Sequence, residues 1–308
     1  MEEISQLDIH GRRKFITTVG KLAGTSMIMA VPGVGHAEKY WQSKTALTVQ
    51  QVIDIILKEI PNARTQNTVD KIRSGRPDQE VTGIVTTMFP TIDVIEKSKK
   101  AGANFIIAHE TPFYNNPDET DWLKDDDVYK YKVDLLSKYK IAIWRFHDNW
   151  HAHKPDGITM GNLIKLGWDK YYNPQTPRLL TLPQPMTIKS IAELAKKRLG
   201  ISTVRAEGDL KQLCTTVYMA FGYMDPKAQI PVIQQMKPDL ILSGETREWE
   251  TVERIRDGLA IGQKTSLLVL GHSVSEEAGM EYAAQWLQPI LPGIQITHIP
   301  SNNPFTFL

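Results

Sequence analysis

Residues 104–110 read NFIIAHE, residues 141–148 read IAIWRFHD, and residues 266–272 read SLLVLGH. Each segment is a short apolar run of the kind that forms a buried strand, and a histidine follows each run. Open α/β sheets build their ligand sites at the carboxyl ends of the strands, so the three segments indicate one shared site. The histidines concerned are His109, His147 and His272.

Helical and extended patterns alternate along the rest of the chain. We predict helices over residues 47–60, 91–101, 127–140, 187–199, 226–236, 248–256 and 275–287. We predict strands over residues 81–87, 104–108, 141–146, 215–221, 239–243, 266–270 and 294–299. This order predicts an α/β protein with mixed sheets. The Pro-rich stretch 174–185 is the best internal boundary, and it predicts two α/β lobes, residues 38–175 and 176–308, that enclose a cleft.

Composition excludes several classes of protein. With 36 Lys+Arg against 35 Asp+Glu in 308 residues, the net charge is +1, so we expect no nucleic-acid partner. A single cysteine, Cys214, excludes an internal disulfide and a Cys-based zinc site, and we interpret it as a small buried hydrophobe. The chain has no G-x-S-x-G elbow, Walker loop or dinucleotide-binding glycine motif. Any metal must therefore be held by His and carboxylate groups.

The N-terminus has the order of regions that characterises an export signal. Residues 11–16, GRRKFI, precede a mild apolar stretch and then small residues up to Ala37. Arg12 and Arg13 predict a twin-arginine signal over residues 1–37 and a periplasmic or other extracytoplasmic location. A frayed amphipathic helix is the alternative. We expect no stable membrane anchor after cleavage, although retention of the signal as an anchor is open.

Histidine and carboxylate side chains occur together at the predicted strand ends. Imidazoles and carboxylates suit zinc, iron or manganese, and a mixed set of about five ligands can hold two ions. If the last helix begins near Ser275, Glu276 lies in its first turn and can fold back beside His272. The alternative is that Glu276 only caps the helix and complements its dipole, and that each histidine is a hydrogen-bonded surface group.

Three segments carry a family resemblance: residues 81–84 with IIAHETPF at 106–113, HDNWH at 147–151 with GNL at 161–163, and GHSVSEEAG at 271–279 with Trp286-Leu287. Residues 239–245 and 303–305 fit as well. Together they resemble the dinuclear-metal-centre family, the GTP cyclohydrolase 1 type 2 homologues or Ngg-interacting-factor-three-like proteins. The resemblance covers almost the whole chain after residue 37, with individually modest motifs.

The resemblance implies two lobes around a pair of metal ions, and a homo-oligomer, often a toroidal hexamer. Carried over position by position, it implies the metal ligands His109, Glu110, His151, His272 and Glu276. Glu110 stands where a second histidine is usual and His151 where an aspartate is usual, so metal identity and occupancy by two ions are open. His147 and Asp148 are expected to orient the ligands from behind or to replace one of them. We interpret His153 as solvated.

These features favour a metal-dependent, cyclohydrolase-like hydrolase of a small-molecule substrate, in which a bound ion activates water. Glu110 or Glu276 could act as general base where it does not bind the metal. GTP is not expected as the substrate outside the cytoplasm. The alternatives are a metal-binding scaffold or sensor without turnover, and a fold in which the departures have abolished binding. Every metal hypothesis requires His109 and His272 to face the same cleft.

Overall fold

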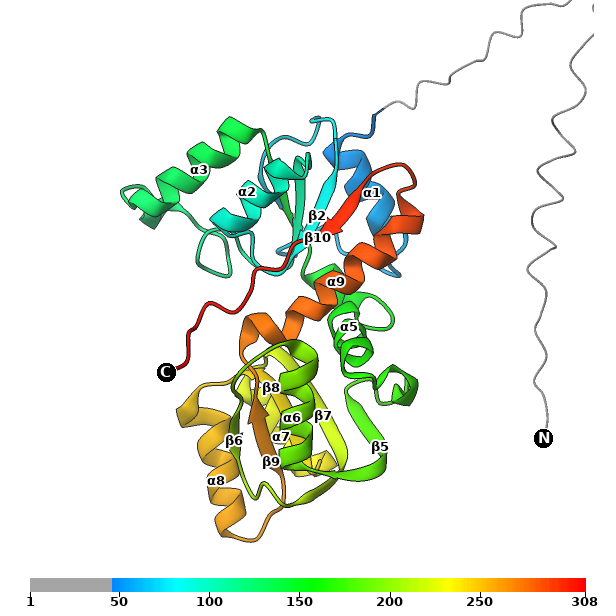
Figure 1. Ribbon diagram of the computed structural model, residues 1–308, viewed down its shortest axis with the longest axis vertical. Helices are drawn as coiled ribbons and strands as arrows, with labels where there is room; N and C mark the ends of the chain where they lie inside the picture. Colours follow the sequence, from blue (N-terminus) through cyan, green and yellow to red (C-terminus); the bar gives the residue numbers. More distant parts are fainter. Residues whose placement is uncertain (1–45) are drawn as a thin grey trace, which may run out of the picture. The chain divides into compact units, whose positions relative to one another are not determined.

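The computed structural model describes residues 46–308, which form two five-stranded sheets with helices packed on them (Figure 1). The predicted signal with Arg12 and Arg13 lies outside the described residues. Both sheets combine parallel and antiparallel pairs, which confirms the predicted α/β class with mixed sheets. None of the helices in residues 46–308 has the length and apolar character that crossing a bilayer requires.

The first sheet has the order β1 (Ile72–Ser74), β4 (Ala142–Arg145), β3 (Phe105–Ala108), β2 (Ile84–Thr87) and β10 (Ile296–His298). Every residue of β2, β3 and β4 is buried, including the polar Thr86, Thr87 and Arg145. β10 comes from the end of the chain and pairs in parallel with β2. A division at residue 175 therefore does not separate the sheets completely, because the chain returns to complete the first one.

The second sheet has the order β5 (Leu179–Thr187), β7 (Leu213–Tyr223), β8 (Leu240–Glu245), β9 (Ser266–Val269) and β6 (Arg205–Glu207). The Pro-rich stretch predicted as a boundary contributes β5 to this sheet. Pro183 and Pro185 are tolerated there because β5 is an edge strand, whose register shifts between Thr181 and Met186.

Most of the α-helices in residues 46–308 follow predicted segments, with changes at their ends, but the helices over residues 148–152 and 157–166 were not predicted. The α-helices are α1 (Val49–Lys58), α2 (Ile92–Lys100), α3 (Asp127–Tyr139), α4 (Asp148–Ala152), α5 (Gly157–Leu166), α6 (Ile188–Leu199), α7 (Pro226–Met236), α8 (Glu253–Ala260) and α9 (His272–Ile290). Asp121–Leu123 and Asp169–Tyr171 form short 3-10 helices, and Glu248–Val252 forms a π-helix before α8. α9 begins three residues earlier than predicted, because Gly271, with φ 107°, turns the chain directly from β9 into the helix.

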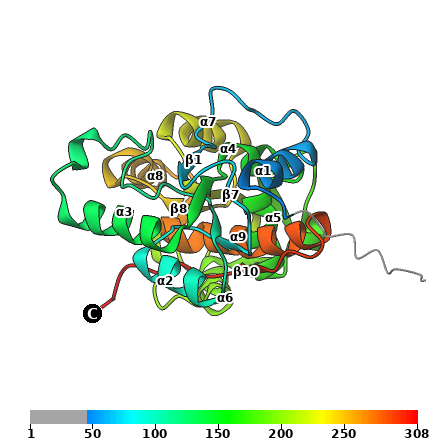
Figure 2. The same cartoon turned by 90° about the horizontal axis from the view of Figure 1, so that it is seen from above.

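α9 lies between the sheets and packs on strands of both of them (Figures 1 and 2). It also crosses α5 at close range. A Cβ atom at Gly279 would lie 2.6 Å from the Cα atom of Ile158, so only glycine permits this approach. Trp150 of α4 donates its indole N–H to the carbonyl oxygen of Gly279 at 3.2 Å. These contacts hold the start of α9, with His272 and Glu276, against the ends of β3 and β4.

Candidate functional site

The histidines and acids at the strand ends lie together. His109 follows β3, His147 follows β4, and His272 opens α9 directly after β9. His272 Nε2 lies 3.2 Å from Glu276 Oε2 and 3.6 Å from Glu110 Oε1. His109 Nε2 lies 3.6 Å from the same Glu276 oxygen, Oε2. His109 and His272 therefore face one site, as the metal hypotheses require.

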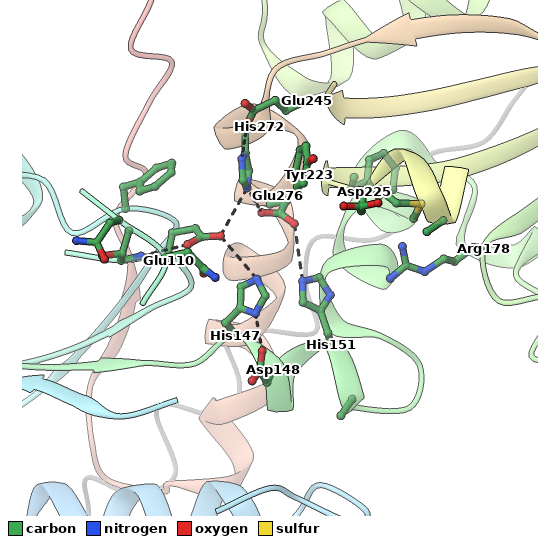
Figure 3. Close-up of a pocket in the computed structure, with 18 of the residues that line it drawn as sticks. Glu110, His147, Asp148, His151, Arg178, Tyr223, Asp225, Glu245, His272 and Glu276 are labelled. Atoms are coloured by element: carbon green, nitrogen blue, oxygen red, sulfur yellow. Dashed lines mark hydrogen bonds and ion pairs between the residues drawn. The ribbon is translucent and has the colours of Figure 1, made fainter. Parts of the chain in front are cut away.

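The side chains form two groups, and within each group the ligand atoms lie within 4.8 Å of one another. Figure 3 shows five of the six side chains. We call His109, His147 and His151 the three-histidine group, and Glu110, His272 and Glu276 the mixed group. Glu276 connects them, since its Oε1 lies 3.8 Å from His151 Nε2 while its Oε2 faces His109 and His272. His147, expected either to orient a ligand or to replace one, presents Nε2 to the site, 3.6 Å from Glu110 Oε1.

The Nδ1 atom of each histidine in the two groups faces an oxygen outside them. The partners are the Phe146 carbonyl for His109 (3.2 Å), Asp148 for His147 (3.0 Å), Asp156 for His151 (3.0 Å) and Glu245 for His272 (2.8 Å). A neutral imidazole in such a pair carries its proton on Nδ1 and leaves the Nε2 lone pair free. Metal-bound histidines in proteins are oriented in this way. All four Nε2 atoms are thus available to one space.

Two buried atoms at the centre of the site lack a partner. The side chains of His109 and Glu276 are 0% and 2% exposed, and neither His109 Nε2 nor Glu276 Oε2 has a hydrogen-bond partner within residues 46–308. Leaving such groups unsatisfied costs about 1–3 kcal/mol each, and more when the group is charged. A lone-pair nitrogen and a carboxylate oxygen are both metal ligands, so these residues fit a divalent cation.

The electrostatics of the mixed group favour added positive charge. Burial works to raise the pKa of Glu110, but the neighbouring His272 and nearby positive charge lower that pKa to about 2. Burial likewise opposes ionisation of Glu276, yet His109 and His272 hold its pKa well below the usual value. Burial works to lower the pKa of His272, whereas its carboxylate partners raise it to about 12. In the absence of a metal, a proton on His272 balances part of the carboxylate charge.

His109 behaves differently from His272. Complete burial lowers the pKa of His109, and Glu276 offsets this only in part. The ring therefore stays neutral at ordinary pH, with Nε2 as an acceptor.

Arg145 binds the carboxylate of Glu110, and the sequence patterns did not indicate this role of Arg145. Its fully buried guanidinium donates from Nη2 to Glu110 Oε2 at 2.6 Å and from Nη1 to Asp118 Oδ2 at 3.1 Å. Arg73 lies 3.0 Å from the same Asp118 oxygen. One oxygen of Glu110 is thus occupied, and the other faces His147 and His272. A charged residue inside an otherwise apolar strand was the signal available in the sequence.

The exposure of His153 and of Cys214 was also predicted from the sequence. His153 is not solvated: it is 8% exposed, its Nδ1 lies 2.7 Å from the Pro155 carbonyl oxygen, and its ring packs against Trp150 and Trp286. The aromatic neighbours bury it away from both groups. Cys214 is fully buried, as predicted, and burial raises its pKa to about 12.

Both groups adjoin a cavity of about 1490 Å³. Its lining combines five of the six side chains of the two groups with arginines from loops and aromatic residues from loops and from β7. His109 is the exception, because it lies behind the others. Arg64, Arg178, Arg247, Tyr218 and Tyr223 also line the cavity.

The fold and the cluster together define an α/β protein with groups that could hold a metal ion where two sheets meet. The chain belongs to the Duf34/NIF3 (NGG1p interacting factor 3) family, whose model matches residues 47–304. This confirms the family suggested by the motifs.

Individual relatives agree with that assignment. A GTP cyclohydrolase 1 type 2 homolog of Clostridium perfringens is 26% identical over 216 residues, which cover 66% of this chain and 76% of the relative. Staphylococcus aureus protein SA1388 has a similar structure, with a TM-score of 0.68, 17% identity, and coverage of 85% of this chain and 99% of that one. A Bacillus cereus protein related to NIF3 has a TM-score of 0.67 at 14% identity, with coverage of 85% and 99%. At these identities the structures establish the fold alone.

Proposed function

We propose that the two groups bind one or two divalent cations, of zinc, iron or manganese, and that the protein is a metal-dependent hydrolase of a small molecule. One observation carries the proposal. Each of the four imidazoles has its Nδ1 tied to an oxygen outside the groups and its Nε2 turned toward the carboxylates of Glu110 and Glu276. Metal sites need this orientation, and ordinary surface histidines do not.

A divalent ion bound there would polarise a substrate oxygen and lower the pKa of water toward neutrality. The protein contributes placement and charge. His109 and Glu276, both buried, supply ligand atoms that water reaches poorly. The lowered pKa values of Glu110 and Glu276 favour a role as ligands, because an effective general base has a pKa near the working pH.

Elemental analysis of the purified full chain tests the metal site. We expect one to two equivalents of transition metal, and loss of metal-dependent thermal stabilisation in His272→Ala. Glu281→Gln is the matched control, because Glu281 lies on the same helix but pairs with Lys165 outside both groups. Absence of metal, together with an unchanged melting temperature of His272→Ala in added metal, would refute the site.

A metal-binding scaffold or sensor is the second candidate, because nothing in the two groups by itself requires turnover. The adjoining cavity favours the enzyme, since catalytic metal sites keep a position open to substrate. Metal-loaded protein should be assayed with nucleotides, cyclic amides and phosphoesters. Turnover that disappears in Glu276→Gln supports the hydrolase, and inactivity with every class supports the scaffold.

Export and assembly stay predictions from the sequence. We propose twin-arginine export to the periplasm or another extracytoplasmic compartment, and a homo-oligomer, possibly a hexamer as in the resembled family. Replacing Arg12 and Arg13 by Lys should retain the protein in the cytoplasm. Unchanged export would refute the targeting proposal.

A further inference from the structure

Three arginines line the cavity, and they differ in their partners. Arg247 is engaged: it lies 3.0 Å from Glu250, and its guanidinium carbon lies 5.5 Å from the ring centre of Tyr223 and 5.9 Å from that of Trp249. Arg64 has no ion-pair partner for its side chain within residues 46–308. The carboxylate that pairs with Arg178 is Asp156 at 3.7 Å, beyond hydrogen-bond distance.

Asp156 is itself committed to other groups. Its Oδ2 lies 3.0 Å from His151 Nδ1, and its Oδ1 accepts the backbone N–H of Thr159 at 2.9 Å. Arg178 therefore faces the cavity with its hydrogen-bonding capacity largely unused, beside the three-histidine group. Figure 3 shows its guanidinium directed toward His151.

The backbones of both arginines are fixed. The Arg64 N–H donates to the side chain of Asn149 at 2.7 Å, and the same side chain donates to the Arg64 carbonyl at 3.0 Å. Asn149 is fully buried in α4, the helix that also carries His151. The Arg178 carbonyl accepts the N–H of Met219 in β7 at 2.8 Å. The Cα atom of each arginine thus has a defined position in the cavity wall.

Tyr218 adds a neutral donor next to Arg178. Its partner across β7 and β5 is Leu179, the residue after Arg178, and the Tyr218 hydroxyl lies close enough to the Arg178 guanidinium for that charge to act on its pKa. Tyr218 is 7% exposed and lines the cavity, and no residue of the described chain hydrogen-bonds to its hydroxyl. Burial raises its pKa, so the hydroxyl keeps its proton at neutral pH.

We propose that Arg178 and Tyr218, with Arg64 on the same cavity, bind an oxyanion of the substrate, either a carboxylate or a phosphate. A guanidinium donates two parallel hydrogen bonds to either group. Because this site lies beside His151 and outside both ligand groups, the charged end of the substrate is separate from the bond that reacts. The substrate is therefore an anionic small molecule whose oxyanion anchors it. That the bound anion belongs to a substrate rests on the proposed function, whereas the oxyanion site itself does not.

Calorimetric titration of the metal-loaded full chain with inorganic phosphate, and separately with acetate, tests the site and distinguishes the two anions. We expect Arg178→Gln to weaken binding of the preferred anion at least about tenfold, because it removes charge-assisted hydrogen bonds to the anion. Arg64→Gln should weaken it less, and Arg178→Lys should restore part of it. Arg198→Gln is the control: Arg198 is an exposed arginine of α6 outside the cavity and should have no effect.

The outcomes separate this inference from the proposed function. Equal anion affinity in wild type, Arg178→Gln and Arg64→Gln, with metal retained, would place the anion on the metal groups and overturn the inference. Failure of the wild type to bind either anion would overturn it as well. Absence of metal in the wild type would refute the proposed function alone, and the same titration of the metal-free chain would then decide the role of Arg178.

Discussion

The three-histidine group and the mixed group occupy one site but are built by different forces. The three histidines all follow strands of the first sheet or lie on α4, and hydrogen bonds to their Nδ1 atoms orient them. The mixed group joins Glu110 of the first sheet to His272 and Glu276 of α9, and charge interactions hold it together. The first group is thus positioned before any cation arrives, whereas the second requires positive charge, from a proton or from a metal.

Removing Glu276 should have the largest effect on metal binding, because this residue contacts both groups. In Glu276→Gln we expect metal binding to both groups to fall by more than the roughly 10–100-fold that follows the loss of a partner behind a ligand. Elemental analysis after dialysis and isothermal titration with Zn²⁺ measure the effect. Glu281→Gln, farther along α9 and paired with Lys165, serves as the control. Retention of one full equivalent of metal in Glu276→Gln would show that the groups bind independently.

Arg145 should matter for the mixed group and for stability. Arg145→Met leaves the buried carboxylate of Glu110 without its guanidinium partner, and Asp118 keeps only Arg73. Breaking a buried ion pair costs about 3–5 kcal/mol, and we expect a loss of that size in the free energy of unfolding, measured in urea. Arg205→Met is the control, because Arg205 forms an exposed pair with Glu248. Equal stability of the two variants would contradict the supporting role of Arg145.

The sequence was sufficient for the central strands and for part of the site. Strands β3, β4 and β9 are buried apolar runs. β3 and β4 are parallel neighbours, so the residues after them lie at one edge of the first sheet, whereas β9 belongs to the second sheet. The strand-end positions predicted that His109 and His272 share a site, but the packing of α9 on both sheets brings them together. The pair His272 and Glu276 also followed from spacing, although α9 begins at His272 and presents the two side chains from successive turns.

The remainder depends on tertiary neighbours that local patterns do not encode. The short edge strands β1 and β6 have no fully buried residue, and β5 contains two prolines, so none has a distinct strand pattern. Arg145 is a charged residue in an otherwise apolar strand, and only its contacts with Glu110 and Asp118 explain its presence there. Asp156 and Glu245 are ordinary acids in sequence, and only their contacts with His151 and His272 give them a role.

The pH dependence of the metal-free chain should show the charge imbalance of the mixed group. The lowered pKa of Glu110, about 2 against an ordinary 4.5, gives stability that is present above pH 4.5 and lost as the pH falls toward 2. The raised pKa of His272, about 12 against 6.5, gives stability that is present below pH 6.5 and lost as the pH rises toward 12. We expect unfolding in urea to be most difficult between pH 4.5 and pH 6.5, with a loss of about 2 kcal/mol by about pH 3 and a larger loss by about pH 9.

Added Zn²⁺ should reverse the alkaline part of this profile, since the metal replaces the proton on His272 and binds more tightly as the pH rises. A metal-free stability curve that is flat from about pH 3 to about pH 9 would contradict the assigned pairing.

The smallest effect should come from replacing the carboxylates that contact the histidine Nδ1 atoms. It should show whether the two groups bind separate ions. Asp156→Asn removes the carboxylate that contacts His151 Nδ1 but keeps a side chain that can cap α5. Glu245→Gln removes the carboxylate that contacts His272 Nδ1. We expect each to weaken one metal ion by about 10–100-fold and to leave the other nearly unchanged. Visible absorption of Co²⁺-loaded protein, titrated with a chelator, resolves the two ions. Asp225→Asn is the control, since Asp225 lines the cavity and its side chain accepts the backbone N–H of Lys227. If both variants weaken both ions equally, then the groups form one site in which Glu276 binds every ion, and the distinction between them is only geometric.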